Sequence, residues 1–124
     1  MVVDDDAGFR RAARTLIGAT AGFKAVGDAS SGAEALRQAD QLRPDLVLMD
    51  VYMRGMDGFE AARRLTDSHS ECVVVLVSLE DLGALLAPAI TSSGAVAFML
   101  KEDLRRSTLR ALWTVHGRRP PSED

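Results

Sequence analysis

Among the stretches of the sequence that are apolar at every position, two restrict the fold more than any other feature. They are residues 46–49 (LVLM) and 72–77 (CVVVLV). A strand with one face in solvent alternates apolar and polar residues, whereas a strand of a parallel sheet is buried on both faces and reads as a continuous apolar run. The two stretches therefore predict a parallel sheet with helices on both sides.

The rest of the chain alternates between strand and helix patterns. Strands are predicted at 2–3, 24–29, 45–50, 72–78 and 95–100, and helices at 9–17, 32–42, 58–66, 81–92 and 105–116. Ser31 and Glu34 read as a capping box for the second helix, and Asp57 as the cap of the third. Gly83 and Pro88 weaken the fourth helical pattern. We expect an α/β, flavodoxin-like (βα)5 fold, with a doubly wound parallel five-stranded sheet in the order 2-1-3-4-5.

Length and composition narrow the class of protein. A chain of 124 residues is long enough to bury a core as one domain. Cys72 is the only cysteine, so we expect a reduced, buried thiol and a cytoplasmic location. The net charge of -3 and the lack of a long apolar run argue against direct nucleic-acid binding and a membrane span. Arg10, Arg11 and Arg14 are interpreted as a solvated helix face, and Asp6 as the start of that helix.

Charged and hydroxyl side chains follow four of the predicted strands. Asp4 and Asp5 end the first strand, Asp50 the third and Ser78 the fourth, and Lys101 follows the fifth. Because the carboxyl ends of parallel strands meet at one edge of the sheet, we expect these residues to share a crevice. Clustered carboxylates hold a cation or raise one another's pKa, and oxygen ligands suit Mg²⁺. Asp50 is then a carboxylate nucleophile toward phosphorus, with Lys101 and Ser78 on phosphoryl oxygens.

Four separated motifs carry a family resemblance. They are VVDDDAGFRRAARTLI, GDASSGAEALRQADQLRPDLVLMD with MRGMDG after it, VVVLVS, and AFMLKED. In their order and spacing they are similar to receiver domains of two-component response regulators, over nearly the whole chain. HGRRPPS and the absence of proline after Lys101 resemble the NarL/LuxR-type branch. The resemblance implies a receiver domain over residues 1–117 and a linker or disordered tail over 118–124.

The resemblance also implies roles for individual residues. They are the phosphoacceptor Asp50 with Ser78 and Lys101 as catalytic partners, the Mg²⁺ ligands Asp5, Asp50, Tyr52 (backbone carbonyl) and Asp4 (through water), and the switch residues Ser78 and Phe98. The implied partners are a sensor histidine kinase, a second copy of the chain in a homodimer, and DNA only through a C-terminal helix-turn-helix domain absent from this chain. Apart from aspartyl self-phosphorylation and dephosphorylation, no enzyme activity is expected.

Some residues depart from the family pattern and leave other functions open. The first strand is short, Arg54 replaces a usual proline, and Leu79 replaces a usual small residue. These departures favour, as an alternative, a degenerate receiver that acts as a phosphorylation-independent interaction module. A Mg²⁺-dependent phosphatase is a second rival, but such an enzyme would normally carry an acid where Tyr52 stands.

Overall fold

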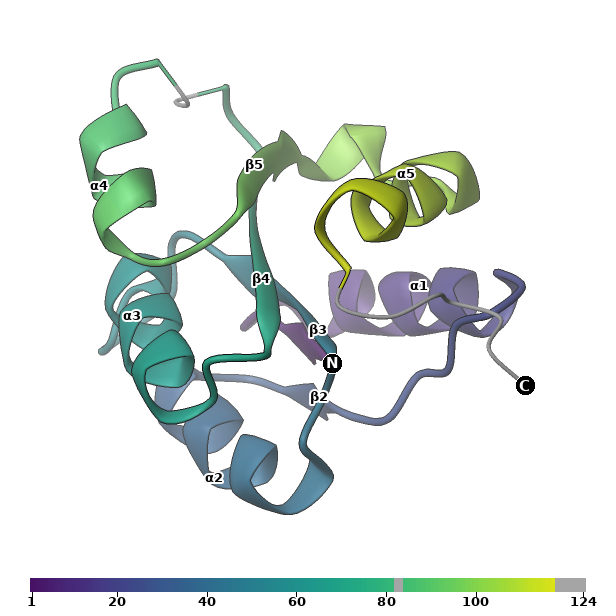
Figure 1. Ribbon diagram of the computed structural model, residues 1–124, viewed down its shortest axis with the longest axis horizontal. Helices are drawn as coiled ribbons and strands as arrows, with labels where there is room; N and C mark the ends of the chain where they lie inside the picture. The colour runs from purple at the N-terminus through teal and green to yellow at the C-terminus, as the bar shows by residue number, and fades with distance from the viewer. Residues whose placement is uncertain (82–83, 118–124) are drawn as a thin grey trace.

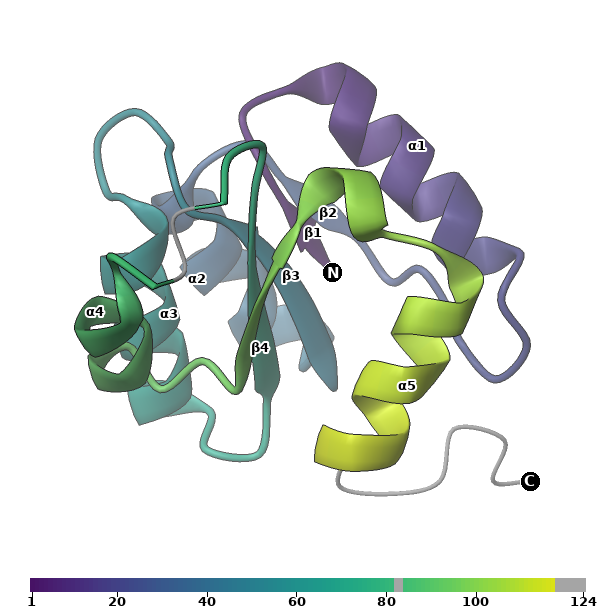
Figure 2. The same cartoon turned by 90° about the horizontal axis from the view of Figure 1, so that it is seen from above.

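The structure is a computed structural model, and it describes residues 1–81 and 84–117. A parallel sheet contains β1 (Val2–Val3), β2 (Asp28–Ala29), β3 (Leu46–Asp50), β4 (Val73–Ser78) and β5 (Ala97–Leu100), in the order β2-β1-β3-β4-β5. The helices are α1 (Ala7–Gly18), α2 (Gly32–Leu42), α3 (Gly58–Ser68), α4 (Ala87–Ser92), the 3-10 helix η1 (Lys101–Asp103) and α5 (Arg106–His116). Helices α1 and α5 cover one face of the sheet, and α2, α3 and α4 lie on the other (Figures 1 and 2). The predicted fold and strand order are confirmed, and none of these helices is long and apolar enough to cross a membrane.

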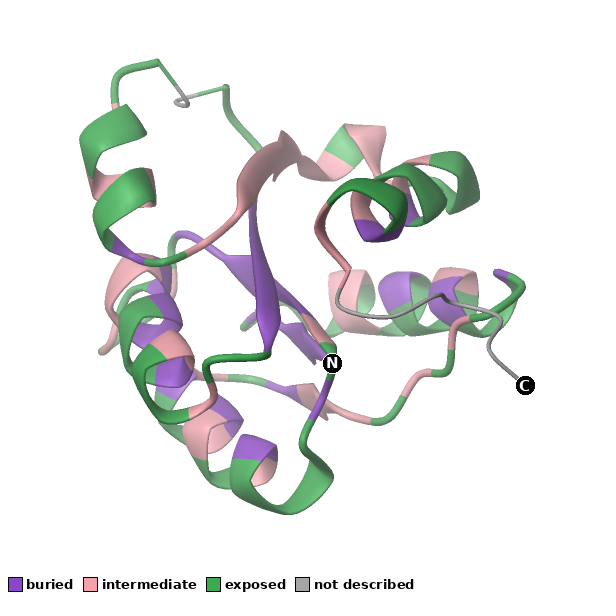
Figure 3. Ribbon diagram, viewed as in Figure 1, coloured by how far each residue is buried: buried purple, intermediate pink, exposed green. Residues whose placement is uncertain are grey.

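The sheet separates two apolar cores, because alternate residues of each strand point to opposite faces. The core on the side of α2 and α3 includes Val47, Met49, Val74, Leu76, Ala35, Ala39, Ala61 and Leu65. The core on the side of α1 and α5 includes Val2, Leu48, Val75, Val77, Ala13, Ile17 and Leu109. Strand β4 is buried along its whole length (Figure 3). The apolar runs of the sequence are thus the central strands, and their carboxyl ends are held firmly.

The second strand is shorter than the sequence predicts. We expected a strand over 24–29, but β2 contains only Asp28 and Ala29. Its only neighbour in the sheet is β1, which pairs Val2 with Asp28 and Val3 with Ala29. A strand at the edge of a sheet extends only as far as its neighbour, so the two-residue β1 limits β2 to the same length.

The fourth helix also differs from its prediction over 81–92. Helix α4 begins only at Ala87, and residues 84–86 form a turn. Pro88 lies in the first turn of α4, where the missing N–H has no helical acceptor to lose. Proline here begins the helix rather than disturbing it, while Gly83 lies outside the described residues, as does the predicted tail over 118–124.

Three helices begin at side-chain caps that the sequence predicts. Asp6 accepts hydrogen bonds from the amides of Gly8 and Phe9, and Asp57 accepts one from the amide of Glu60. Ser31 caps α2 through the amide of Glu34. The capping box is displaced by one residue, because the Glu34 carboxylate accepts from the amide and hydroxyl of Ser30 instead of the Ser31 amide.

The chain's single thiol is buried, as expected. Cys72 is 6% exposed and lies immediately before β4. Burial raises the pKa of the Cys72 thiol to about 11. The amine of Met1 is also buried, and it donates a hydrogen bond of 2.8 Å to the carbonyl of Leu46.

Candidate functional site: an acidic crevice at the carboxyl edge of the sheet

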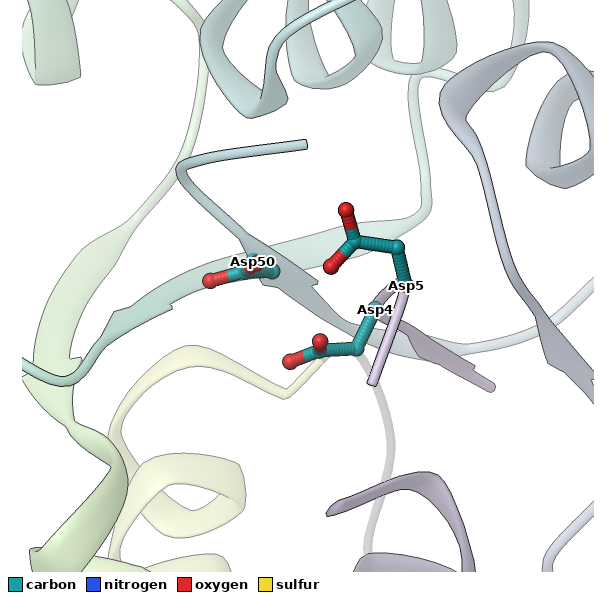
Figure 4. A group of neighbouring side chains, drawn as sticks. All are labelled: Asp4, Asp5 and Asp50. Atoms are coloured by element: carbon teal, nitrogen blue, oxygen red, sulfur yellow. The ribbon is translucent and has the colours of Figure 1, made fainter. Parts of the chain in front are cut away.

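Three carboxylates meet at the ends of the two neighbouring strands β1 and β3. Val3 pairs with Met49, so Asp4 leaves β1 beside Asp50, the last residue of β3. One carboxylate oxygen from each of Asp4, Asp5 and Asp50 lies within 4.8 Å of the others (Figure 4). Asp4 and Asp50 are buried, whereas Asp5 is exposed. The predicted convergence of the acids is confirmed.

Lys101 brings a positive charge to the same point from the end of β5. Its Nζ lies 2.6 Å from Asp4 Oδ2 and 3.5 Å from Asp50 Oδ1, and its side chain is only 9% exposed. The ring of Phe9, from the first turn of α1, faces the ammonium group with its centroid 4.6 Å from Nζ. Lys101 is therefore held by two carboxylates and one aromatic face.

The electrostatic balance of the crevice leaves Asp50 unfavourably placed as an anion. Burial and the charge of Asp4 raise the pKa of Asp50 to about 6, although Lys101 opposes the shift. Burial favours the neutral amine of Lys101, but its contact with Asp4 and the charge of Asp50 outweigh this, so the pKa of Lys101 is raised. One lysine does not neutralise three acids, and the crevice retains an excess of negative charge.

The two carboxylate oxygens of Asp4 have different partners. Its Oδ1 accepts a hydrogen bond of 2.9 Å from the amide of Asp6. Its Oδ2 is buried and, despite the ion pair with Lys101, accepts no well-aligned hydrogen bond within residues 1–81 and 84–117. Because Lys101 already lies against this oxygen, it is the remaining negative charge of the three carboxylates that favours a further positive ligand. The all-oxygen donor set of Asp4, Asp5 and Asp50 suits a hard divalent cation such as Mg²⁺.

Ser78 lies on the strand next to Asp50. Asp50 pairs with Val77 across β3 and β4, so Ser78 ends β4 one residue further along. Ser78 is buried, and its Oγ accepts a hydrogen bond of 3.2 Å from the amide of Glu80. Leu79 follows with 77% of its surface exposed, so most of this side chain lies in solvent.

The two remaining predicted site residues lie at different depths. Phe98 is half-buried in β5, pairs with Leu76 and packs against the core on the α3 side. Tyr52 is 55% exposed in the loop after β3. The structure therefore places Phe98 one strand away from Ser78 and Tyr52 two residues beyond Asp50, and their functional roles stay predictions.

A glycine brings the start of α3 directly over the end of β3. The amide of Gly58 donates a hydrogen bond of 2.8 Å to the carbonyl of Val51. A Cβ at this position would overlap the carbonyl oxygen of Asp50 and lie 2.8 Å from the Cα of Val51. Only glycine allows this approach, which brings the two ends of the 51–57 loop together.

Sequence reasoning missed two residues next to the site. Phe9 is predicted only as the first residue of the helix over 9–17, and Arg10 and Arg14 are interpreted as part of a solvated face. That interpretation is wrong for Arg10, whose side chain is only 19% exposed and binds Asp28. Arg14 is 46% exposed, as interpreted, although it also pairs with Asp28. One feature of the sequence could have indicated these contacts. Phe9 and Arg10 lie in the first turn of the helix that follows Asp4 and Asp5, so they are close to the acidic pair along the chain. The faces that they present depend on how α1 lies against the sheet.

Comparison with known proteins agrees with this geometry. The family model of the response regulator receiver domain matches residues 1–112. The response regulator GacA of Pseudomonas viridiflava is 38% identical over 101 residues, covering 82% of this chain and 47% of the relative. A protein-glutamate methylesterase/protein-glutamine glutaminase of Hahella chejuensis is 37% identical over 97 residues, covering 77% of this chain and 28% of the relative. The chain thus spans less than half the length of these curated relatives.

Solved structures give the same result. The signal receiver domain of the putative response regulator NarL from Mycobacterium tuberculosis has a TM-score of 0.81 and 31% identity, covering 95% of this chain and 94% of that one. A LuxR-family response regulator from Aurantimonas has a TM-score of 0.83 and 26% identity, covering 93% of this chain and 81% of that one. With the family model over residues 1–112, these matches show that the chain belongs to the family of response regulator receiver domains.

Proposed function

We propose that this receiver domain accepts a phosphoryl group on Asp50 from the phosphohistidine of a sensor kinase, with Mg²⁺ bound beside it. The observation that supports this most directly is the position of Asp50. Its carboxylate ends a buried strand, lies next to Asp4 and Asp5, and has Lys101 Nζ at 3.5 Å. A buried acid in an under-neutralised cluster is destabilising for the fold, and such an arrangement is typical of a functional site.

The transfer exchanges one phosphorus bond for another. A carboxylate oxygen of Asp50 attacks the phosphorus atom, the phosphorus–nitrogen bond of the phosphohistidine breaks, and the imidazole leaves with the electron pair. Catalysis of phosphoryl transfer is mainly positioning and charge neutralisation. Lys101 is already within reach of Asp50, so it can pair with a phosphoryl oxygen after a small movement.

The acidic residues fit Mg²⁺ as the cation. Asp5 and Asp50 would bind the ion directly with the backbone carbonyl of Tyr52, and Asp4 would bind it through water. Bound Mg²⁺ would supply the positive charge that keeps Asp50 ionised and offsets the charge of the incoming phosphoryl oxygens. The excess negative charge of the three carboxylates and the exposure of Asp5 to solvent support this assignment.

Phosphorylation would act by biasing two conformations of the domain. Ser78 would donate its hydroxyl hydrogen to a phosphoryl oxygen, and the segment after β4 would follow it. Its present partner is the amide of Glu80, two residues along the same segment. Phe98, half-buried on the neighbouring β5, would change rotamer in response. A difference of a few kcal/mol between the states is enough to alter the affinity for a partner.

The proposed output is a change in homodimer or effector affinity in the cytoplasm. Two structural relatives are described as LuxR-family response regulators, and one of these two is described as DNA-binding. Because the chain spans only part of its curated relatives, DNA binding would come through a separate helix-turn-helix domain. The methylesterase activity named for other relatives is not proposed for this chain, which covers 28% of the Hahella protein.

Intact mass measurement tests the proposed function. The protein is incubated with Mg²⁺ and acetyl phosphate, and we expect a mass increase of one phosphoryl group that EDTA prevents. Asp50→Asn should remove the increase. Asp45→Asn is the matched control, because it removes one carboxylate immediately before the opposite end of β3 and should leave the increase intact.

An unmodified wild-type mass after long incubation would contradict the proposal. It would favour the alternative of a degenerate receiver that binds partners without phosphorylation. Leu79 and Arg54, the two departures from the family pattern near the crevice, are both exposed and motivate this alternative. Hydrolysis of a phosphomonoester that depends on Asp50 would instead support the phosphatase.

A further inference from the structure

Arg10 joins the acidic pair to the edge of the sheet through one guanidinium group. Its Nη1 donates a hydrogen bond of 2.7 Å to the backbone carbonyl of Asp4, and its Nε donates one of 2.9 Å to Asp28 Oδ2. The Arg10 side chain is 19% exposed. Arginine suits this bridge because its planar group presents several donors in a fixed geometry.

A second arginine holds the other oxygen of Asp28 but does not touch the acidic pair. Arg14 Nη1 lies 3.0 Å from Asp28 Oδ1, and the Arg14 side chain is 46% exposed. Asp28 belongs to β2, which pairs with β1. Asp28 is therefore a fixed acceptor, and of the two arginines only Arg10 also contacts Asp4.

The contacts of Arg10 complete the restraint of the Asp4 backbone. The amide of Asp4 donates to the carbonyl of Ala29 at 3.0 Å, and the carbonyl of Asp4 accepts from Arg10. The peptide unit between Asp4 and Asp5 is thus restrained at its oxygen, and Asp5 projects from the far side of that unit. The side chain of Asp5 is exposed, so its direction depends on the backbone from which it projects.

We propose that Arg10 is a positioning residue of the metal site: by bridging the Asp4 carbonyl to Asp28, it fixes the backbone from which Asp5 projects and so sets the affinity for Mg²⁺. This inference rests on the proposed function, because it concerns the same cation. It goes beyond that function in assigning a role to a side chain that is neither a metal ligand nor a contact of the phosphoryl group.

Positioning and simple electrostatics predict opposite signs for a change at Arg10. A cation near a metal site repels the metal, so removing its charge would tighten Mg²⁺ binding if charge alone mattered. If Arg10 acts through geometry, removing it loosens the Asp5 backbone and weakens binding. Partners that orient metal ligands typically contribute 10-fold or more in affinity.

The experiment measures metal binding rather than phosphorylation. Mn²⁺ is the probe, because oxygen sites accept both ions and free Mn²⁺ gives an electron paramagnetic resonance signal. Competition with Mg²⁺ then gives the Mg²⁺ affinity of wild type, Arg10→Gln, Arg10→Lys, Asp28→Asn and Arg14→Gln. We expect Arg10→Gln and Arg10→Lys to bind Mg²⁺ about 10-fold more weakly. Arg14→Gln, the matched control, should stay within about twofold of wild type because Arg14 does not contact Asp4.

The remaining variants keep the inference testable. Asp28→Asn leaves Arg10 in place but removes its charged anchor, so we expect an intermediate loss of about threefold, and this variant stands in if Arg10→Gln does not fold. Unchanged or tighter binding in Arg10→Gln, or wild-type affinity in Arg10→Lys, would overturn the inference. So would an equal loss in Arg14→Gln. Wild type that binds no Mg²⁺ at all would instead refute the proposed function, and this inference with it.

Discussion

At the scale of single residues, Lys101 determines how the acidic crevice is balanced. Its Nζ lies closer to Asp4 than to Asp50, at 2.6 Å against 3.5 Å. Asp4 is therefore the better neutralised of the two buried acids, and the raised pKa falls on Asp50. The residue proposed to accept the phosphoryl group is the one whose charge the metal-free protein accommodates least well.

Replacing Asp50 by asparagine should stabilise the metal-free domain near pH 7. The pKa of Asp50 is about 6 in the folded protein, above its ordinary value of 3.8. The unfolded chain loses this proton near pH 4 and the folded domain near pH 6, so the free energy of unfolding falls as the pH rises between these values. We expect Asp50→Asn to gain about 1 kcal/mol at pH 7, after allowance for solvent screening, and nothing below pH 4. Urea unfolding in EDTA, carried out at pH 7 and below pH 4, measures the free energy of unfolding of both proteins.

The difference between wild type and Asp50→Asn must be followed, rather than either curve alone. Burial lowers the pKa of the Met1 amine to about 6. An amine with a lowered pKa makes stability rise with pH between about 6 and 8, opposite in sign to the effect of Asp50. The amine is present in both proteins, so it cancels in the difference. A variant less stable than wild type at pH 7 would contradict the assignment of strain to Asp50.

The contact of Phe9 with Lys101 should be measurable as a coupling energy. Phe9→Leu keeps most of the apolar volume but removes the ring that faces Nζ at 4.6 Å. We expect a coupling of about 0.5 to 1 kcal/mol between Phe9→Leu and Lys101→Met in a double-mutant cycle by urea unfolding. Additive effects of the two changes would show that the ring acts only as apolar volume.

At the scale of elements, the start of α3 is the part of the fold most tightly fitted to the site. Asp57 caps the helix, and Gly58 brings its first turn onto the backbone of Asp50 and Val51. The loop before it turns at Gly55, whose φ is +76°. Because two glycines and a cap act in succession, the loop that contains Tyr52 has a defined path from β3 to α3.

Gly58→Ala should therefore cost far more than an ordinary glycine replacement. A Cβ there would overlap the carbonyl of Asp50, so α3 must move away, at a cost of about 2 to 3 kcal/mol. Gly18→Ala is the matched control, because Gly18 is also helical and a Cβ there would meet nothing within 4 Å. That control should be neutral or gain about 0.5 kcal/mol from helix propensity. Equal stabilities of the two variants in thermal melts would contradict the close approach.

At the scale of the whole molecule, much of the fold could be predicted because the decisive pattern is local. Strands apolar on both faces require a covered parallel sheet, and that sheet places all carboxyl ends at one edge. The gathering of Asp4, Asp50 and Lys101 follows from this alone, whatever the details of packing. The switch roles of Ser78 and Phe98 cannot be derived in this way, because a switch depends on how a side chain moves as well as on where it lies.

The features that could not be predicted from the sequence depend on how separate helices and strands pack against one another. The length of β2 is set by its pairing with β1, whose partner residues are 26 positions away along the chain, as from Val2 to Asp28. The contacts of Arg10 and Arg14 with Asp28 depend on the rotation of α1 over the sheet. Hydrophobic periodicity shows which face of a helix is buried, but not which acceptors lie beside its polar residues.

Mg²⁺ should stabilise the whole domain by an amount set by its affinity. A ligand that binds only the folded state adds about 1.4 kcal/mol at a concentration ten times its dissociation constant. We expect the melting temperature to rise with Mg²⁺ in wild type and Asp45→Asn and to respond much less in Asp50→Asn. Equal shifts in all three proteins would place the cation elsewhere.

The buried thiol of Cys72 can report on local opening of the domain through its rate of chemical labelling. Cys72 is the only cysteine of the chain, it is 6% exposed, and its pKa of about 11 leaves almost no thiolate at neutral pH. A thiol reagent can therefore react only when the edge of the sheet where β4 begins separates from its surroundings. The labelling rate would follow that fluctuation at the end opposite the acidic crevice, without an engineered probe.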